Sequence, residues 1–255
     1  MTRLPSVIPA AISREVLGRH TAARVALGRA GASLPTRAHL AFVGDHARAR
    51  DAVWTAVDFD ALAAALGARS LVTVRLHSRA PDRATYLRRP DLGRLLDDAS
   101  LSRLASLAEA GGNRIAIVIA DGLSAEAVQT NAVAVVEPLV AALEAQGSRV
   151  ACVALVEQGR VAVGDPVGEA LGADLVVVLI GERPGLSAAD SLGCYVTWAP
   201  RPGTPDSRRN CISNIRCGGL IPADAAARIA WLVGEATKRR LTGVALKQEE
   251  VPVSR

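Results

Sequence analysis

Residues 114–120 read RIAIVIA and residues 174–180 read DLVVVLI, and these two stretches decide the fold. Each is a short apolar run rich in β-branched side chains, as is typical of strands that are buried on both faces. A third apolar run, at 149–156, follows a helical stretch at 124–146. Strands that alternate with helices of this length indicate βαβ units. We therefore expect an α/β fold with a Rossmann-like, mostly parallel sheet flanked by helices.

Weaker patterns complete this α/β part of the chain. Alternating apolar and polar residues at 70–76 predict a half-buried first strand. Shorter strands are expected at 161–163, 194–198 and 211–215, and further helices at 90–110, 167–171 and 222–240. Ser124 is the expected N-cap of the long helix at 124–146, and Pro138 predicts a kink or a break inside that helix.

The first quarter of the chain is predicted to be helical. Helices are expected at 11–28, 36–57 and 60–66, with a glycine-bearing loop at 28–36. Gly67 ends the last of these helices, and the strand-like pattern begins after it. We accordingly divide the chain into a helical N-terminal region, residues 1–67, and an α/β domain, residues 68–255.

Length and composition exclude several classes of protein. The chain has 255 residues, of which 50% are hydrophobic, and this is enough to bury a sizeable core. Four cysteines in this length do not make a disulfide-dense scaffold. Pro5 and Pro9 interrupt the N-terminus, which lacks the apolar segment of a secretory signal, and no run approaches the about 20 apolar residues of a membrane span. We expect a cytoplasmic protein with reduced cysteines and no membrane partner.

The basic charge of the chain raises the question of nucleic-acid binding. There are 30 Lys and Arg residues against 25 Asp and Glu residues, and only Lys238 and Lys247 are lysine. The 28 arginines are spread along the chain, and the longest basic run is 238–240. The seven aromatic residues are scattered and form no platform on which bases could stack. We therefore expect no nucleic-acid partner.

Polar residues and glycines follow every predicted strand of the α/β domain after the first. These segments are 121–124, 157–161, 181–185, 199–201 and 211–219. Because ligands of open parallel sheets bind outside the carboxyl ends of the strands, the segments predict a binding rim. Two alternatives stay open: Asp121 in an ordinary turn or as a helix cap, and Glu182 paired with Arg183 at the surface.

No known motif supplies a catalytic set. The chain has no GxGxxG after a strand, no GxxxxGK[ST] loop, no CxxC pair, no HExxH and no GxSxG. The four histidines, His20, His39, His46 and His77, all lie in the first third. We predict neither a catalytic residue nor a metal site. A binding rim without a catalytic set indicates a subunit that helps to hold a ligand while the chemistry takes place elsewhere.

Several motifs are specific in combination. They are RVALGRAG (24–31), YLRRPDLGR (86–94), DGLS (121–124), GRV (159–161), GERPGL (181–186), CY (194–195) and CISNI (211–215). With these motifs, in this order, the chain resembles the small (light) subunit of ethanolamine ammonia-lyase, an adenosylcobalamin-dependent enzyme. The resemblance extends from about residue 15 to about residue 245, while the segments 201–209 and 216–220 are less typical of the family.

The resemblance implies a reaction and a division of labour. The enzyme converts ethanolamine into acetaldehyde and ammonia. A large barrel subunit holds the substrate, and the small subunit closes over the corrinoid cofactor, which lies at the interface. Cofactor contacts are implied at Val161, Glu182 and Cys211, all on the predicted rim. Further candidates on the same rim are Arg160, Arg183, Asn214 and Asp121.

The resemblance also implies the state of the cofactor and of the complex. The chain lacks the Asp-x-His-x-x-Gly pattern that supplies a lower histidine ligand in other cobalamin proteins, so a base-on cofactor with no protein histidine ligand is expected. The family forms a hetero-oligomer of six heterodimers with the large subunit, and this chain alone is expected to be inactive. Enclosure of the complex in a bacterial microcompartment stays open.

Two other classes of function stay open beside this one. A non-enzymatic nucleotide-binding or nucleic-acid-binding α/β module rests only on the basic charge and the predicted sheet. A stand-alone enzyme for a small molecule is disfavoured by the missing catalytic set.

Overall fold

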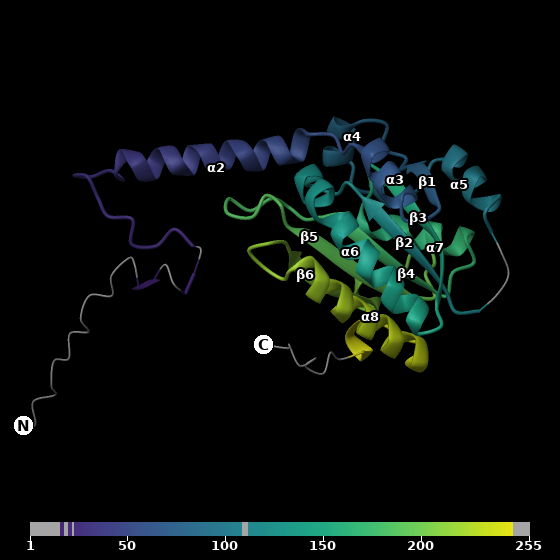
Figure 1. Cartoon of the computed structure of the whole chain (residues 1–255). Coiled ribbons are helices and arrows are strands. Elements are labelled where there is room, and N and C mark those ends of the chain that lie inside the picture. Colours follow the sequence, from purple (N-terminus) through teal and green to yellow (C-terminus); the bar gives the residue numbers. More distant parts are fainter. Residues whose placement is uncertain (1–15, 18–19, 22, 109–111, 247–255) are drawn as a thin grey trace, which may run out of the picture.

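The computed structural model describes residues 16–17, 20–21, 23–108 and 112–246. Within these residues the centre of the fold is a six-stranded sheet with the order β1-β3-β2-β4-β5-β6 (Figure 1). The strands are β1 (Thr73–His77), β2 (Arg114–Ala120), β3 (Arg149–Glu157), β4 (Leu175–Gly181), β5 (Leu192–Trp198) and β6 (Arg209–Ile215). The α-helices are α2 (Thr36–Trp54), α3 (Phe59–Gly67), α4 (Arg83–Arg88), α5 (Asp98–Ala105), α6 (Ala125–Ala145), α7 (Gly164–Ala170) and α8 (Pro222–Arg239). Short 3₁₀ helices are η1 (Leu92–Arg94), η2 (Val161–Val163), η3 (Asp206–Arg208) and η4 (Gly243–Ala245).

The sheet is mixed. Strands β1, β3, β2 and β4 run parallel, whereas β5 runs antiparallel to β4, and β6 runs antiparallel to β5. The predicted α/β fold is confirmed, but its parallel character holds for the first four strands only. The connections 182–191 and 199–208 are ten residues each. Because a parallel crossover needs about a dozen residues or more, segments of this length favour an antiparallel return.

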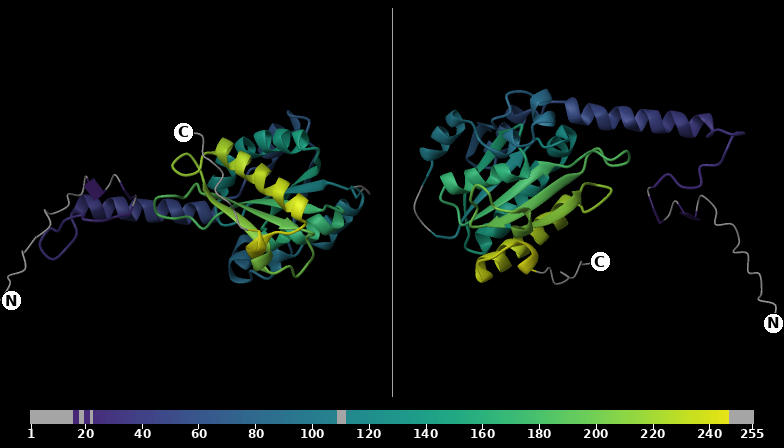
Figure 2. Two further views of the ribbon diagram at one scale, coloured as in Figure 1. Left: turned by 90° about the horizontal axis from the view of Figure 1, so that it is seen from below. Right: turned by 180° about the vertical axis from the view of Figure 1, so that it is seen from behind.

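Helices cover both faces of the sheet (Figure 2). One face packs against α3, α6 and α8 in the larger core cluster. The other face packs against α5 and α7, for example through Leu104 and Val167. Every residue of β2 and β4 is buried, as their continuous apolar sequences predict. Ser124 caps α6 as expected, with its side chain accepting the Ala127 N–H. Of the kink or break predicted at Pro138, the break is wrong because α6 continues through this residue, and the kink stays a prediction.

Helix α2 projects away from the sheet and its helical layers (Figure 1), and Ala52 is its one buried residue. The predicted helix at 36–57 is therefore confirmed, with its end at Trp54. The predicted helix at 11–28 lies partly outside the described residues, and its described end, 23–28, is not helical. The predicted helix at 60–66 is α3, which packs into the core through Phe59 and Leu66. The domain division at residue 67 stays a prediction.

Two predicted elements are wrong. Residues 161–163 form η2 rather than a strand. The predicted helix at 90–110 is interrupted: η1 is followed by extended Leu95 and Leu96, and Asp97 then caps the separate helix α5 by accepting the Ser100 N–H at 2.7 Å. An aspartate in this position starts a new helix because it satisfies a free N–H group of the first turn. Across the described residues, none of the helices combines the length and the apolarity needed to cross a membrane.

Candidate functional site

Glu182, the first residue after β4, ties both ends of the connection 182–191 to β6 at the rim of the sheet. Its Oε2 accepts hydrogen bonds from Ser191 Oγ at 2.6 Å and from the Asn214 backbone N–H at 3.2 Å. Ser191 precedes β5, and Asn214 lies near the end of β6. Asn214 has a φ of 58°, and the pairing of β5 with β6 shifts register opposite it, as in a β-bulge. Within the described residues Oε1 of Glu182 accepts no hydrogen bond and is left for a donor.

Asp121 is a buried carboxylate directly after β2. It accepts hydrogen bonds from the backbone N–H groups of Gln158 at 3.0 Å and Gly159 at 2.9 Å, and Arg83 Nη1 lies 3.3 Å from its Oδ2. Burial raises the pKa of Asp121 to about 6, although Arg83 and the two N–H groups favour the charged form. The helix-cap alternative is wrong, since Ser124 caps α6. Asp121 instead ties the end of β2 to the turn after β3.

Tyr86, in α4, supports the same turn. The guanidinium carbons of Arg83 and Arg160 lie 4.7 Å and 4.1 Å from the centroid of its buried ring. The Tyr86 hydroxyl donates to the Gly159 carbonyl at 3.1 Å, and Arg160 Nη2 donates to the Tyr86 carbonyl at 3.1 Å. Burial raises the pKa of the Tyr86 phenol and keeps it protonated as a donor. Arg160, predicted as a cofactor contact, is thus engaged with α4.

Within the described residues, no helix packs over the part of β5 and β6 that carries Tyr195 and Cys211 on one face of the sheet. Tyr195 of β5 pairs with Cys211 of β6, and both lie on the side of the sheet that α5 and α7 cover over the other strands. Val161 of η2 and Tyr195 pack at the margin of that core cluster, while Cys211 and Ser213 are exposed. We call the surface formed by Val161, Tyr195, Cys211 and Ser213 the open face. It extends from η2 to the edge strand of the sheet.

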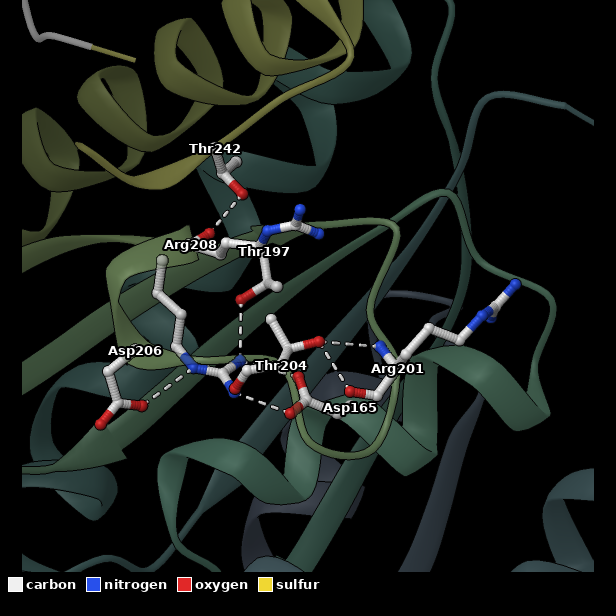
Figure 3. Close-up of polar contacts among 8 residues, drawn as sticks. Asp165, Thr197, Arg201, Thr204, Asp206, Arg208 and Thr242 are labelled. Carbon is white, nitrogen blue, oxygen red and sulfur yellow. Dashed lines mark hydrogen bonds and ion pairs between the residues drawn. The ribbon is translucent and has the colours of Figure 1, made fainter. Parts of the chain in front are cut away.

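A buried ion pair closes the loop 199–208 beside this site (Figure 3). Arg209 Nη1 and Nη2 each lie 2.7 Å from a carboxylate oxygen of Asp165, and their side chains are 2% and 1% exposed. Arg209 also donates to Thr197 Oγ1 and to the Thr204 carbonyl. Burial is the largest influence on the pKa of Arg209 and lowers it, but the hydrogen bonds and negative charges of Asp165 and Asp206 together outweigh burial, so the pKa is raised. A cavity of about 360 Å³ lies beside the pair, between the loop, η1 and η2.

The predicted site residues fall into separate groups. Asp121 and Arg160 belong to the turn after β3, Glu182 and Asn214 meet at the rim, Val161 and Cys211 lie on the open face, and Arg183 is exposed next to Glu182. The prediction that 199–201 lies on the rim is wrong. Because β5 is antiparallel to β4, the end of β5 lies beside the start of β4, away from the rim. There the Ala199 N–H donates to the Asp174 carbonyl at 2.7 Å.

Sequence reasoning missed four residues of this region: Arg83, Tyr86, Ser191 and Tyr195. Tyr86 lies in the motif YLRRPDLGR and Tyr195 in the motif CY, and the chain has only seven aromatic residues. An aromatic residue inside a family motif is therefore the signal that could have found them. Arg83 carried no signal among 28 arginines. Among the described residues, no group of three or more His, Cys, Asp or Glu side chains is placed to hold a metal ion.

Fold and rim together define a class: an α/β protein with polar residues gathered at the strand ends of a mixed sheet, the position where open α/β sheets bind ligands. Residues 13–247 match the family described as ethanolamine ammonia-lyase light chain (EutC). The ethanolamine ammonia-lyase small subunit of Ralstonia nicotianae is 55% identical over 242 residues, which are 94% of this chain and 90% of the relative. The small subunit of Azotobacter vinelandii is 56% identical over 235 residues, 91% of this chain and 87% of the relative. The chain belongs to the ethanolamine ammonia-lyase light-chain family.

Proposed function

We propose that this chain is the small subunit of an adenosylcobalamin-dependent ethanolamine ammonia-lyase and acts only together with a large catalytic subunit. The observation that carries the proposal is the family match over residues 13–247, combined with a rim that holds Glu182 and Asn214 together beside the open face. In this proposal the complex converts ethanolamine into acetaldehyde and ammonia. The large subunit holds the substrate, because the rim of this chain offers binding groups and no catalytic set.

The residues of the rim and the open face fit a corrinoid. A corrin ring is broad and flat, and its margin carries amide side chains. Val161, Tyr195 and Cys211 lie on one sheet face and offer it an apolar surface. Glu182 Oε1 is suited to accept a hydrogen bond from a corrin amide. When bound, adenosylcobalamin supplies the radical chemistry of the reaction.

The chain's own residues bind and orient the cofactor in this proposal. Ser191 and Asn214 fix the Glu182 carboxylate through two hydrogen bonds, so the acceptor is preorganised before the cofactor arrives. Tyr195 stays protonated, because burial raises its pKa and the neighbouring Cys211 adds to the rise. We propose a base-on cofactor, with no histidine of this chain as a cobalt ligand. His77 ends β1, which is the edge strand on the other side of the sheet from β6 and the open face.

Helix α2 is the proposed docking element for the large subunit. Leu40, Val43 and Trp54 are 63%, 47% and 56% exposed, and the first two are three residues apart on one side of the helix. Because most of the stability of a helix in a protein comes from packing of its apolar face, the exposed apolar side chains of α2 are expected to be covered in the complex. Replacing Leu40 and Val43 by Ser should weaken co-purification with the large subunit while the urea unfolding of the α/β domain stays unchanged. Intact co-purification would contradict this role of α2.

The decisive experiment compares three samples: this chain, the large subunit, and both together, each with adenosylcobalamin and ethanolamine. Acetaldehyde formation, followed with an aldehyde reductase, is expected only for the combined sample. Lyase activity of the isolated chain, or full activity of the large subunit without it, would overturn the proposal. A gel shift of an oligonucleotide that weakens with salt would favour the nucleic-acid-binding alternative instead.

A further inference from the structure

The turn that carries Val161 is held from outside at three successive residues. Asp121 accepts the N–H groups of Gln158 and Gly159, at 3.0 Å and 2.9 Å. Tyr86 donates its hydroxyl to the Gly159 carbonyl at 3.1 Å, and the Arg160 N–H donates to the Gly93 carbonyl at 2.7 Å. The backbone that leads into η2 is therefore set by groups directly after β2, on α4 and on η1 rather than by the turn itself.

Arg83 connects this arrangement to α2. Its Nη1 lies 3.3 Å from Asp121 Oδ2 and 3.3 Å from Gln158 Oε1. Its Nε donates to the carbonyl of Val53, near the end of α2, at 2.6 Å. The side chains of Arg83 and Asp121 are 13% and 9% exposed, so the pair is shielded from water. One guanidinium thus links the projecting helix to the turn.

The chemistry of Asp121 suits a positioning role. A carboxylate presents acceptor oxygens to both N–H groups and to the guanidinium at once, whereas the isosteric amide of Asn has one acceptor oxygen and an NH₂ group that opposes an N–H donor. Burying a carboxylate is costly unless it is paired and hydrogen-bonded, and here both conditions are met next to the rim.

From this geometry we propose that Asp121 and Arg83 form a positioning pair, which holds the Gln158–Gly159 turn so that Val161 meets the corrinoid. The inference rests on the proposed function and deepens it, because it adds residues that touch no cofactor themselves. Tyr86 is the second support of the same turn. Because Arg83 also donates to the Val53 carbonyl, the end of α2 is part of the same support. The Arg83 guanidinium therefore connects the proposed docking helix to the turn that places Val161.

The test uses the assembled complex with the large subunit and hydroxocobalamin as the probe, titrated by its absorbance. Asp121→Asn is expected to raise the dissociation constant about tenfold or more, the loss typical of a charge-assisted hydrogen bond. Hydrogen exchange of the Gln158 and Gly159 amides should speed up in the same variant. Tyr86→Phe, which removes one hydroxyl, should raise the dissociation constant about fivefold. If Asp121→Asn fails to assemble with the large subunit, the dissociation constant of Tyr86→Phe decides whether the support of the turn matters for binding.

Two matched variants separate the possible failures. Asp174→Asn changes a carboxylate just before β4, at the end of the strands away from the rim, where it accepts the Arg114 N–H at 3.0 Å. This variant should leave the dissociation constant unchanged. Glu182→Ala should raise the dissociation constant without faster exchange at Gln158 and Gly159. If the unaltered complex does not bind the probe, the proposed function fails and the inference with it. If it binds and Glu182→Ala weakens binding, but Asp121→Asn and Tyr86→Phe bind as tightly as the unaltered complex, the positioning pair alone is refuted.

Discussion

Replacing Arg209 by Met tests the part of the structure that closes the loop beside the site. Arg209 makes a two-pronged ion pair with Asp165, at 2.7 Å on both sides, and both side chains are almost wholly buried. The guanidinium also holds the Thr204 carbonyl, in the middle of the loop 199–208. Met fills most of the same volume without a charge. The substitution therefore leaves the Asp165 carboxylate buried and unpaired, and it releases the loop.

The expected loss follows from the burial of the pair. Removing one partner of a buried ion pair destabilises a protein by about 3–5 kcal/mol, because the remaining charge has no compensation. Each kcal/mol lowers the melting temperature of a chain of this size by about 2–4 °C, so Arg209→Met should melt about 6–20 °C lower. Urea unfolding followed by tryptophan fluorescence measures the free-energy change, since Trp198 lies in β5 next to Thr197.

A second substitution separates charge burial from loss of packing. In the double variant Asp165→Leu, Arg209→Met neither charge remains, and the free energy of unfolding should recover most of the loss of the single variant. A single variant that loses less than about 1 kcal/mol would place the pair in the range of exposed ion pairs and refute the reasoning. The reasoning is equally refuted if the free-energy loss of the double variant equals the sum of the losses of Arg209→Met and Asp165→Leu alone, because the two side chains would then not be coupled.

Four further predictions concern two turn glycines and two carboxylates of the rim. Gly122→Ala should destabilise by roughly 3 kcal/mol in urea unfolding, because φ is +57° there and a Cβ would lie 2.2 Å from the Gly181 carbonyl oxygen. Gly203→Ala, with φ +89° and open space around it, should lose only about 1 kcal/mol. Because burial raises the pKa of Asp121 to about 6 from 3.8, its contribution favours the folded state below pH 4 and disappears as the pH rises through 6. The unfolding free energy of the unaltered chain should therefore fall by up to about 3 kcal/mol between pH 4 and pH 6 through Asp121, and Asp121→Asn should remove this fall. The same pH dependence in the variant and in the unaltered chain would contradict the raised pKa. Glu182→Ala should weaken hydroxocobalamin binding to the complex roughly tenfold or more, and an unchanged titration curve would remove Glu182 from the site.

The central strands could be predicted from sequence because their physics is local. A strand buried on both faces must be apolar at every position, so RIAIVIA and DLVVVLI leave few alternatives, and the structure places β2 at 114–120 and β4 at 175–181. The triplet at 161–163 shows the limit of this argument. Val161 and Val163 favour a strand by propensity, but η2 forms there because the preceding turn is held by residues far away in the sequence.

The placement of candidate site residues at strand ends was predictable, but their contacts were not. Strand ends indicated Asp121 and Glu182, yet the partner of Asp121 is Arg83, and the partners of Glu182 are Ser191 and Asn214. These contacts join residues 38, 9 and 32 positions apart. No short motif encodes such separations, because they depend on which strands become neighbours in the sheet.

The direction of β5 and β6 decides where a broad ligand has room. In a βαβ unit the helix that returns the chain also covers a face of the sheet, so every added parallel strand brings its own cover. The ten-residue connections before β5 and before β6 contain no α-helix, and α8 after β6 packs on the face that already carries α3 and α6. Among the residues that the structure describes, the part of the face with Tyr195 and Cys211 is therefore left without a helix, directly beside the turn that carries Val161. An additional parallel strand with its crossover helix would have filled this surface, so the antiparallel return that sequence reasoning missed is also the feature that creates the open face.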